Sequence, residues 1–482
     1  MQPHMPSPSH MPPPALSRRA DATLAEQLAE RFAQRIEQRL LAPGARLPSI
    51  RECARAQSLS PSTVVAAYDR LLARGLVQAR PQRGYFVRER ALPAKARGPA
   101  AQPTARLLPV SATALIRGML QRDAHLGGPG LGTLPAEWLD LPMLQQALRK
   151  VLADPQQAAA ALHYGHPAGE PRLREQLRHS LAELGIRAGT EQIVTTQGAT
   201  QALDFVARTL LRPGDPVLVD EPGWAVEHAR LAAAGMQLLP VPRGEDGPDL
   251  AVMARLMKAH QPRLYVTVSV LHNPTGASLS LQAAHQVLQL AHEHDVHIVE
   301  DDTYAHLASP HLPRLAALDG LRRTLYVSGF SKFLAPGWRV GYLAAPAALV
   351  ERLVDTKLLS SLTTPSWPEL ALAHCLEQGH LLRHAERLRQ RLAAARARVV
   401  KLAQAHGFTF ATPPRGLFGW IEVGTDTERA ARALLDDGWL LAPGTLFHVP
   451  PRPSTLMRIN FATSHDLAFW RRLQTLARRG PV

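Results

Sequence analysis

The chain has few cysteines and no long apolar stretch. Its two cysteines, Cys53 and Cys375, are far apart in 482 residues, so we expect no disulfide framework and a reducing cytoplasm as the setting. No run approaches the roughly 18 apolar residues of a membrane-spanning helix, and no membrane partner is expected. Residues 1–20 lack the apolar core of a signal peptide, and their Pro, Ser and Met content predicts a disordered tail.

Positive charge is concentrated near the N-terminus. The whole chain carries a net charge of +15, and residues 1–97 contain 16 Lys and Arg against 7 Asp and Glu, a net +9. This asymmetry favours a polyanion as the partner of the N-terminal part. Charge alone leaves a solvated basic surface as the alternative.

A chain of this length exceeds one ordinary domain. Residues 89–125 are rich in Ala, Pro and Arg and show little periodicity until Leu115, which predicts a linker. It separates a small module, residues 21–88, from a large body, residues 126–482. A flexible linker of this length has an end-to-end spread of about 35 Å, so the module could dock on a second subunit.

The small module begins with two predicted helices. Apolar residues recur every four positions from Leu24 to Leu40, which predicts an amphipathic helix that Pro43-Gly44 ends. A second helix is expected over about Ile50–Gln57, where Ser49 can accept a backbone hydrogen bond as the N-cap.

A third helix and a hairpin complete the module. Ser60 is a second N-cap, Pro61 suits the first helical position, and Gly75 suits the C-terminal end. Extended runs at 76–78 and 85–87 then read as a β-hairpin. A helix, a helix-turn-helix and a hairpin in this order predict a winged helix, whose third helix enters the major groove of DNA.

This module resembles the GntR family of bacterial regulators over about residues 22–88. Pro61 departs from the family pattern, which usually has Arg after the capping Ser. The alternative is a three-helix module that binds protein. If the resemblance holds, the module binds double-stranded operator DNA. The candidate DNA-binding residues are Arg46, Ser49, Arg51, Ser60, Ser62, Thr63, Tyr68, Arg83 and Gly84.

The large body has the pattern of an α/β fold. Short apolar runs alternate with amphipathic stretches such as Leu281–Glu293, which is typical of buried parallel strands separated by helices. Ligands of open α/β sheets bind beyond the carboxyl ends of the strands. The apolar runs are Ile193–Val194, Val217–Val219, Leu264–Val270, Val296–Val299, Leu325–Val327 and Val340–Leu343.

Polar residues follow three of these runs. Asn273 follows the third run, Asp301 and Tyr304 follow the fourth, and Lys332 follows the fifth. A lysine at such a strand end can have a lowered pKa and act as an amine nucleophile. Taken singly, a lysine in such a position is more often an ordinary surface lysine. Together these segments resemble, in order and spacing, the aminotransferases of fold type I over about residues 130–482.

The resemblance implies a fold and a catalytic centre. The fold is a winged helix-turn-helix followed by large and small subdomains of the aminotransferase type, at about 165–360 and about 361–482 plus 126–160. Lys332 would form a Schiff base, the internal aldimine, with pyridoxal 5'-phosphate. Asp301 would pair with the pyridine nitrogen, which keeps the ring able to accept electrons. Lys332, Asp301 and Tyr304 would be the catalytic residues.

Other residues would bind the cofactor and the substrate. Asn273 and Tyr304 would contact the ring hydroxyl, and Trp224 would stack on the ring. Tyr164 resembles a tyrosine that reaches the phosphate of the other subunit, which implies a homodimer. Arg458 resembles an arginine that binds a substrate carboxylate. The phosphate would be held by Ala199, Thr200, Ser331 and Arg339.

Two further segments bear on ligands. Gly329 stands where relatives usually have Ser or Thr that binds the phosphate, and Ser328 is a candidate substitute. His292–His297 is rich in histidine and acid residues and imitates a metal cluster. Its spacing fits no known geometry well, and no metal is expected.

A GntR-like module joined to an aminotransferase-like body resembles the MocR-type bacterial regulators. This resemblance implies a transcription regulator of the bacterial cytoplasm. Its body would sense pyridoxal phosphate, or a small amine or amino acid that forms an aldimine with it. The alternative is an active amino acid aminotransferase with an accessory DNA-binding domain. A third possibility is a sensor of pyridoxal phosphate alone.

Overall fold

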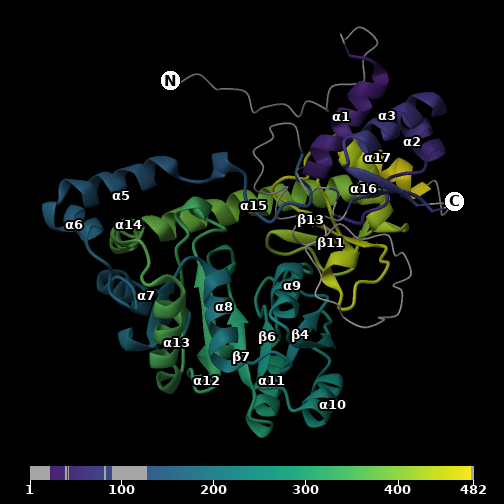
Figure 1. Cartoon of the computed structure of the whole chain (residues 1–482). Coiled ribbons are helices and arrows are strands. Elements are labelled where there is room, and N and C mark those ends of the chain that lie inside the picture. The colour runs from purple at the N-terminus through teal and green to yellow at the C-terminus, as the bar shows by residue number, and fades with distance from the viewer. Residues whose placement is uncertain (1–21, 38–40, 42, 81–82, 89–126, 479–482) are drawn as a thin grey trace, which may run out of the picture.

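The structure is a computed structural model that describes residues 22–37, 41, 43–80, 83–88 and 127–478 (Figure 1). The expected tail at 1–20 and linker at 89–125 lie outside these ranges. A small N-terminal module packs beside a larger body. None of the helices in the described part of the chain is both long and apolar enough to cross a membrane.

The N-terminal module is a winged helix, as predicted. It consists of three helices and an antiparallel hairpin, in which Val77 lies opposite Val87. Its core is a single apolar cluster that includes Leu28, Phe32 and Val64. The elements are α1 (Leu24–Glu37), α2 (Ile50–Gln57), α3 (Pro61–Ala73), β1 (Val77–Arg80) and β2 (Gly84–Val87).

Both predicted caps of the module are formed. Ser49 and Glu52 make a reciprocal capping box at the start of α2, and Ser60 accepts a 3.1 Å hydrogen bond from the backbone N–H of Thr63 in α3. Pro61 takes the first helical position, where no backbone donor is needed. These local rules explain why the boundaries of both helices match the sequence.

The body is built on a seven-stranded sheet in the order β3-β9-β8-β7-β6-β4-β5. Every neighbouring pair is parallel except those of β9, which is antiparallel to β8 and to β3. The expectation of a parallel sheet is therefore wrong at β9. The strands are β3 (Ile193–Thr196), β4 (Pro216–Glu221), β5 (Gln237–Pro242), β6 (Leu264–Thr267), β7 (His297–Asp301), β8 (Thr324–Gly329) and β9 (Gly341–Ala344).

The connection from β8 to β9 explains this direction. It comprises residues 330–340 and contains only one short 3-10 turn. A parallel pair needs a longer crossover, usually with a helix, whereas an antiparallel pair does not. The same short connection carries Lys332 and Arg339, so both residues lie beyond the carboxyl end of β8, where β9 begins.

Helices cover both faces of the sheet and form a three-layer α/β arrangement (Figure 1). α8 (Ala199–Leu210) and α13 (Ala347–Ser361) pack on one face through residues such as Phe205 and Leu353. α10 (Leu250–His260) and α11 (Leu281–Glu293) pack on the other. The bounds of α11 are those predicted. The shorter helices are α9 (Ala225–Ala233) and α12 (Leu315–Asp319).

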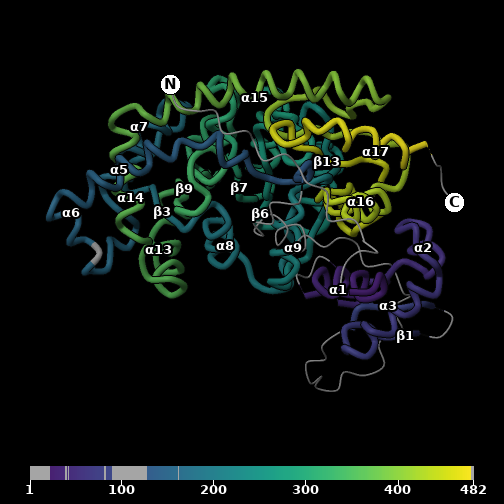
Figure 2. The backbone as a smooth tube through the Cα atoms, turned by 90° about the horizontal axis from the view of Figure 1, so that it is seen from above, coloured from purple at the N-terminus to yellow at the C-terminus, as the bar shows by residue number. Residues whose placement is uncertain are grey.

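Further helices lie beside the three layers. The helix α15 spans 26 residues and runs along the body from the large sheet to a second, smaller sheet (Figure 2). The helices are α5 (Leu141–Ala153), α6 (Pro155–Ala159), α7 (Pro171–Glu183), α14 (Ser366–Glu377) and α15 (His380–Ala405).

The second sheet is antiparallel, in the order β10-β11-β13-β12. Residues 127–133, here called the strap, run along it, and Gly127 forms a β-bridge with Trp439. α1 of the winged helix lies beside α16 in both views (Figures 1 and 2). The elements are β10 (Thr409–Phe410), β11 (Phe418–Glu422), α16 (Thr427–Asp436), β12 (Ala442–Pro443), β13 (Leu456–Asn460) and α17 (Leu467–Arg478).

Candidate functional site

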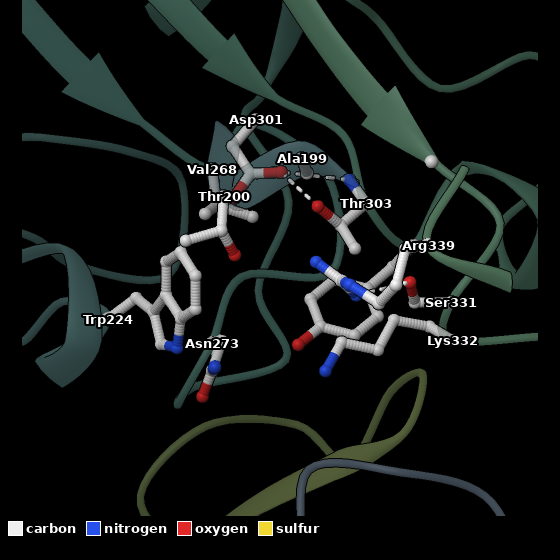
Figure 3. A pocket seen from close by; sticks show the side chains of 12 residues that line it. Ala199, Thr200, Trp224, Val268, Asn273, Asp301, Thr303, Ser331, Lys332 and Arg339 are labelled. Carbon is white, nitrogen blue, oxygen red and sulfur yellow. Dashed lines mark hydrogen bonds between the residues drawn. The ribbon is translucent and has the colours of Figure 1, made fainter. Parts of the chain in front are cut away.

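A cavity of about 80 Å³ lies where β6, β7 and β8 end. It brings together nine of the ten residues that the sequence suggested for the cofactor. Trp224 lies on one side of the cavity and Lys332, Ser331 and Arg339 lie on the other (Figure 3). The lining residues are Ala199, Thr200, Trp224, Val268, Asn273, Asp301, Thr303, Tyr304, Gly329, Ser331, Lys332 and Arg339.

Three consecutive acidic residues lie where β7 ends, the third just after the strand, and only one of them lines the cavity. Glu300 accepts 2.8 Å bonds from the backbone of α12, and Asp302 pairs with Arg314 at 2.6 Å. Side chains alternate between the faces of a strand, so Asp301 points away from both neighbours. Glu300 and Asp302 are therefore structural residues, and Asp301 lines the cavity.

Asp301 is buried beside Thr303, whose backbone N–H donates to it at 3.1 Å and whose hydroxyl also donates to it. Burial raises the pKa of this carboxyl to about 6, against the lowering effect of Thr303. The part of the cavity lining that the structure describes supplies no ion pair to this carboxylate. A cationic ring nitrogen would provide the missing partner.

Lys332 is the cavity's amine. Burial, followed by the charge of Arg458, lowers the pKa of its ammonium to about 8, although Asp301 opposes the shift. The Lys332 Nζ donates a 3.1 Å hydrogen bond to the carbonyl oxygen of Gly132 in the strap. A lowered pKa increases the fraction of free amine at neutral pH, which a nucleophile requires.

The start of α8 and Arg339 form a cradle for an anion. Gly198 has φ +83°, and a Cβ there would lie 2.5 Å from a guanidinium nitrogen of Arg339. Arg339 itself has φ +53° and donates to the Gln197 carbonyl at 2.8 Å and to the Ser331 hydroxyl at 3.2 Å. Free backbone N–H groups of α8 and this arginine suit a phosphate.

The remaining walls suit a planar ring. Trp224 presents its indole, while Asn273 and Tyr304 bring an amide and a phenol to the cavity. Tyr304 packs edge-on against Phe418 at 5.5 Å between ring centroids, and burial raises the pKa of its hydroxyl. These residues, together with Asp301, Lys332 and the anion cradle, fit pyridoxal phosphate as a whole.

Arg458 is buried next to the cavity rather than in its wall. Its guanidinium donates to the Asn273 side-chain oxygen at 2.8 Å and to the Gly130 carbonyl at 2.6 Å. It also lies 4.4 Å from the ring centroid of Phe418. Burial lowers its pKa to about 10, so it remains a cation at neutral pH and can receive a carboxylate.

Tyr164 and Ser328 do not line the cavity of their own chain. Tyr164 is 81% exposed. Ser328 does not substitute for the hydroxyl missing at Gly329, because it is buried and donates to the Asp302 carbonyl at 2.9 Å. The suggestion that Ser328 helps to bind the phosphate is therefore wrong.

Sequence reasoning missed several positioning groups. Asp220, at the end of β4, pairs with Arg243 at 3.0 Å and accepts from the Tyr265 hydroxyl at 2.5 Å, all three buried. Thr303 was also missed, although its place two residues after Asp301 is typical of a turn that bonds back to a carboxylate. The strap carbonyls of Gly130 and Gly132 gave no sequence signal.

The proposed DNA-binding surface lies on α2, α3 and the hairpin. Arg46, Arg51 and Arg83 are exposed, and so are Ser49, Ser60 and Ser62. Thr63 and Gly84 are half-buried beside them. Ser60 also contacts the hydroxyls of Ser62 and Thr63 at 2.8 and 2.7 Å, so part of its role is capping.

Tyr68 is the exception among the suggested DNA contacts. It is fully buried in the core of the module, and its hydroxyl donates to the Pro48 carbonyl at 2.9 Å. It packs edge-on against Tyr85 and Phe32. Tyr68 therefore stabilises the module and does not reach DNA. Among the described residues, no group of three or more His, Cys, Asp or Glu is placed to hold a metal ion.

Comparison with known proteins divides the chain in the same way. Residues 139–469 match the aminotransferase class I and II family, and residues 24–87 match the gntR family of bacterial regulatory proteins. An HTH-type transcriptional regulator of Escherichia coli, YdcR, is 30% identical over 91% of this chain and 94% of its own. The probable rhizopine catabolism regulatory protein MocR of Rhizobium meliloti is 29% identical over 92% of this chain and 91% of its own.

Enzymes are also similar to the body. A 2-aminoadipate transaminase of Thermus thermophilus is 30% identical over 69% of this chain and 84% of its own. A solved alpha-aminoadipate aminotransferase from Thermus thermophilus, complexed with N-(5'-phosphopyridoxyl)-L-leucine, is 27% identical, with TM-score 0.68 over 76% of this chain and 94% of that one.

These matches confirm the predicted fold class and support the predicted cofactor. The body is an aminotransferase class I and II domain, and pyridoxal phosphate is the cofactor of that fold. The module is a GntR winged helix. The chain therefore belongs to the MocR-type regulators, in which a GntR winged helix is fused to an aminotransferase class I and II domain.

Proposed function

We propose that this chain is a DNA-binding transcription regulator whose body senses pyridoxal phosphate, or an amine or amino acid that reacts with it. The observation that carries the proposal is an intact cofactor site, with Lys332 and Asp301 facing one cavity, in a chain that begins with a DNA-binding module. Such a regulator works in the bacterial cytoplasm, where its operator is found.

Bound pyridoxal phosphate would supply an aldehyde that condenses with amines. Lys332 is prepared for this reaction by its lowered pKa of about 8. At pH 7 roughly a tenth of its side chains are unprotonated, against fewer than about one in a thousand for an ordinary lysine. The free amine thus exists at neutral pH without a separate base.

Asp301 would hold a proton on the ring nitrogen. Its carboxyl, with a pKa of about 6, is mainly ionised at neutral pH even without a partner, and a cationic partner would lower that pKa. Thr303 fixes its orientation through the 3.1 Å backbone bond. The carboxylate therefore stabilises the cationic ring that the chemistry requires.

Arg458 would bind the carboxylate of an amino acid effector. Its guanidinium is held against Phe418 and Phe447, at 4.4 and 5.3 Å from the ring centroids. Both hydrogen bonds it makes, to Asn273 and Gly130, are to neutral oxygens. A carboxylate is the stronger acceptor for a guanidinium and would replace at least one of them.

A homodimer is part of the proposal. Exposed apolar side chains lie on two segments that are joined by a hydrogen bond, in which the Gly165 N–H donates to the Thr363 hydroxyl at 3.2 Å. Leu162, Tyr164 and Leu359 are 79%, 81% and 87% exposed. Clusters of this kind usually mark an interface, and a second copy would let Tyr164 reach the partner's cofactor site.

Two other functions remain candidates. An active aminotransferase is favoured by the complete set of Lys332, Asp301, Tyr304 and Arg458, and by the similarity to a 2-aminoadipate transaminase. A sensor of pyridoxal phosphate alone needs no amine. Steady turnover of an amino acid with a 2-oxo acid would identify the first, and a DNA affinity that responds to the cofactor but to no amine or amino acid would identify the second.

The central test is a titration of the cofactor-loaded protein with amines and amino acids. Absorbance of the cofactor and affinity for a selected DNA duplex are measured in the same samples. The regulator hypothesis expects some ligands to change both, and DNA affinity to fall steeply with salt as counterions are released. A Lys332→Ala protein with unchanged DNA affinity and unchanged effector response would contradict it.

A further inference from the structure

The strap is held by the two cations that a cofactor and an effector need. Lys332 Nζ donates to the Gly132 carbonyl at 3.1 Å, and Arg458 donates to the Gly130 carbonyl at 2.6 Å. Asn460 donates to the carbonyls of Leu131 and Thr133 at 3.0 and 2.8 Å. Two of these hydrogen bonds therefore use the groups that would hold a cofactor and an effector carboxylate.

The strap is also fixed to the segment that follows α16. The Gly127 N–H donates to the Gly438 carbonyl at 2.8 Å, and the Leu440 N–H donates back to Gly127 at 2.9 Å. The Gly130 N–H donates to the Leu440 carbonyl at 2.8 Å. A Cβ at Gly130 would lie 2.4 Å from the backbone of Leu441, so the two chains are in close contact. The strap and residues 438–441 are therefore joined along their backbones.

The C-terminal end of α16 contacts the winged helix. Arg35 of α1 forms an ion pair with Asp436 and donates to the Leu435 carbonyl at 3.3 Å. The side chains of Arg35 and Asp436 are only 12% and 24% exposed. α1 and α16 lie side by side in both views (Figures 1 and 2). Asp436 is two residues before Gly438, which the strap holds.

We propose that the end of α16, Leu435 and Asp436, is a docking surface for the winged-helix module, and that the strap couples this surface to Lys332 and Arg458. The proposal rests on the regulator function above and names the route of its signal. The occupant of the surface is the module's own α1, whose Arg35 is complementary in charge to Asp436.

The coupling follows from the hydrogen bonds. If the Lys332 ammonium gives one proton to solvent, the resulting amine would condense with the cofactor aldehyde: the C=O bond of the aldehyde breaks, one C=N bond forms, and the oxygen leaves as water. The nitrogen then carries at most one N–H in place of the three of an ammonium, and the cofactor fixes its position. Gly132 loses its donor, and an effector carboxylate on Arg458 displaces Gly130. The strap, residues 438–441 and Asp436 then shift together. By linkage, undocking the module must change cofactor affinity by the same factor.

The first experiment separates docking from net charge. Asp436→Arg breaks the pair with Arg35, and Glu386→Arg makes the same charge change on α15, where Glu386 pairs with Arg389. Arg35→Asp combined with Asp436→Arg restores an opposite-charge pair. The affinity of each full-length protein for a selected duplex is measured with and without pyridoxal phosphate.

We expect the cofactor to change DNA affinity at least fivefold in the wild-type protein and in the Glu386→Arg control. The change should fall below twofold in Asp436→Arg and return in the charge-swapped protein. If Asp436→Arg responds as the wild type does, the docking proposal is wrong and the sensor function stands. If no protein responds to the cofactor, and the titration with amines and amino acids also leaves DNA affinity unchanged, both proposals are wrong.

The second experiment observes the strap itself. Hydrogen exchange of the Gly127, Gly130 and Leu440 amides is followed with and without pyridoxal phosphate. We expect the cofactor to accelerate exchange in the wild type and in Asp436→Arg, because that variant loses only the contact between α16 and the module. We expect no acceleration in Lys332→Ala, which lacks the amine that reacts with the cofactor. Unchanged exchange in a wild-type protein that shows the cofactor's covalent absorbance would overturn the coupling through the strap, whatever the state of folding of any variant.

Discussion

Lys332 is half-buried and Lys357 is fully buried, and loss of solvation is the main cause that lowers the pKa of both to about 8. Lys357 lies 3.4 Å from the hydroxyls of Thr195 and Thr364 and does not line the cavity. The two residues therefore have similar acidity and different surroundings. What distinguishes Lys332 is access to the anion cradle and to Asp301.

This comparison predicts where pyridoxal phosphate attaches. After incubation with the cofactor and reduction with borohydride, peptide mass mapping should place the adduct on Lys332 and none on Lys357. Lys357→Met should label to the wild-type extent, and Lys332→Met should not label. A substantial adduct on Lys357 would show that lowered pKa, and not the cavity, selects the amine.

The pH dependence of the free energy of unfolding should also reflect the ionisation of Lys332. The pKa of Lys332 is lower in the folded chain than the ordinary 10.5, so between about pH 8 and pH 10.5 the unfolded chain binds more protons. Below about pH 8 the folded chain is destabilised by the full free energy of desolvating the ammonium, and above about pH 10.5 this destabilisation is absent. Without cofactor, Lys332→Met should be more stable than the wild type at pH 7, by roughly 1–3 kcal/mol.

That stability difference should shrink as the pH rises from about 8 to about 10.5. It is measured by denaturant unfolding of both proteins at several pH values. A difference that stays constant across this range would mean that the buried ammonium is not its cause. Lys357→Met, measured alongside, shows whether any buried lysine gives the same effect.

At the scale of elements, the turn from β3 into α8 controls the anion cradle. Gly198→Ala would strain a φ of +83° and push a methyl group into Arg339. We expect at least tenfold weaker binding of pyridoxal phosphate, measured by absorbance titration. Gly337→Ala is the matched control, because nothing lies within 4 Å of its Cβ position and its φ is not positive. Equal affinity in both variants would exclude this role of the turn.

The predictability of the elements depended on local signals. The helices α2, α3 and α11 were predicted because their caps and periodicity lie within the segments themselves. The strand β5 (Gln237–Pro242) was missed because Pro240 and Pro242 interrupt the pattern of a strand. Proline is tolerated there because β5 is an edge strand with a neighbour on one side only.

The site was predictable where side chains carry the chemistry. Asp301, Lys332 and Arg339 could be recognised by type and spacing. The bond from Lys332 to Gly132 joins residues 200 positions apart through a backbone carbonyl, which no pattern of residue types reveals. Tyr68 shows the opposite error, because a residue on a recognition helix was assigned to DNA although it faces the core.

At the scale of the molecule, the exposed leucines predict an obligatory partner. Leu359→Glu places a charge on a position that is 87% exposed in the single chain, so the chain itself should remain folded. In a dimer the charge would be buried, and sedimentation should show a shift toward monomer. Leu281→Glu, 55% exposed at the start of α11, is the control. A Leu359→Glu protein that remains dimeric would place the interface elsewhere.

Tyr164 does not line the cavity of its own chain, so the proposed dimer predicts how defects in two different chains combine. In a mixture of Lys332→Ala and Tyr164→Phe chains, a hybrid pair has one site with both defects and one with neither. Two inactive alleles should therefore complement each other when expressed together. Recovery of cofactor binding to about half of the sites in purified hybrids would show that each site is assembled from two chains. Hybrids without such recovery would show that one chain suffices.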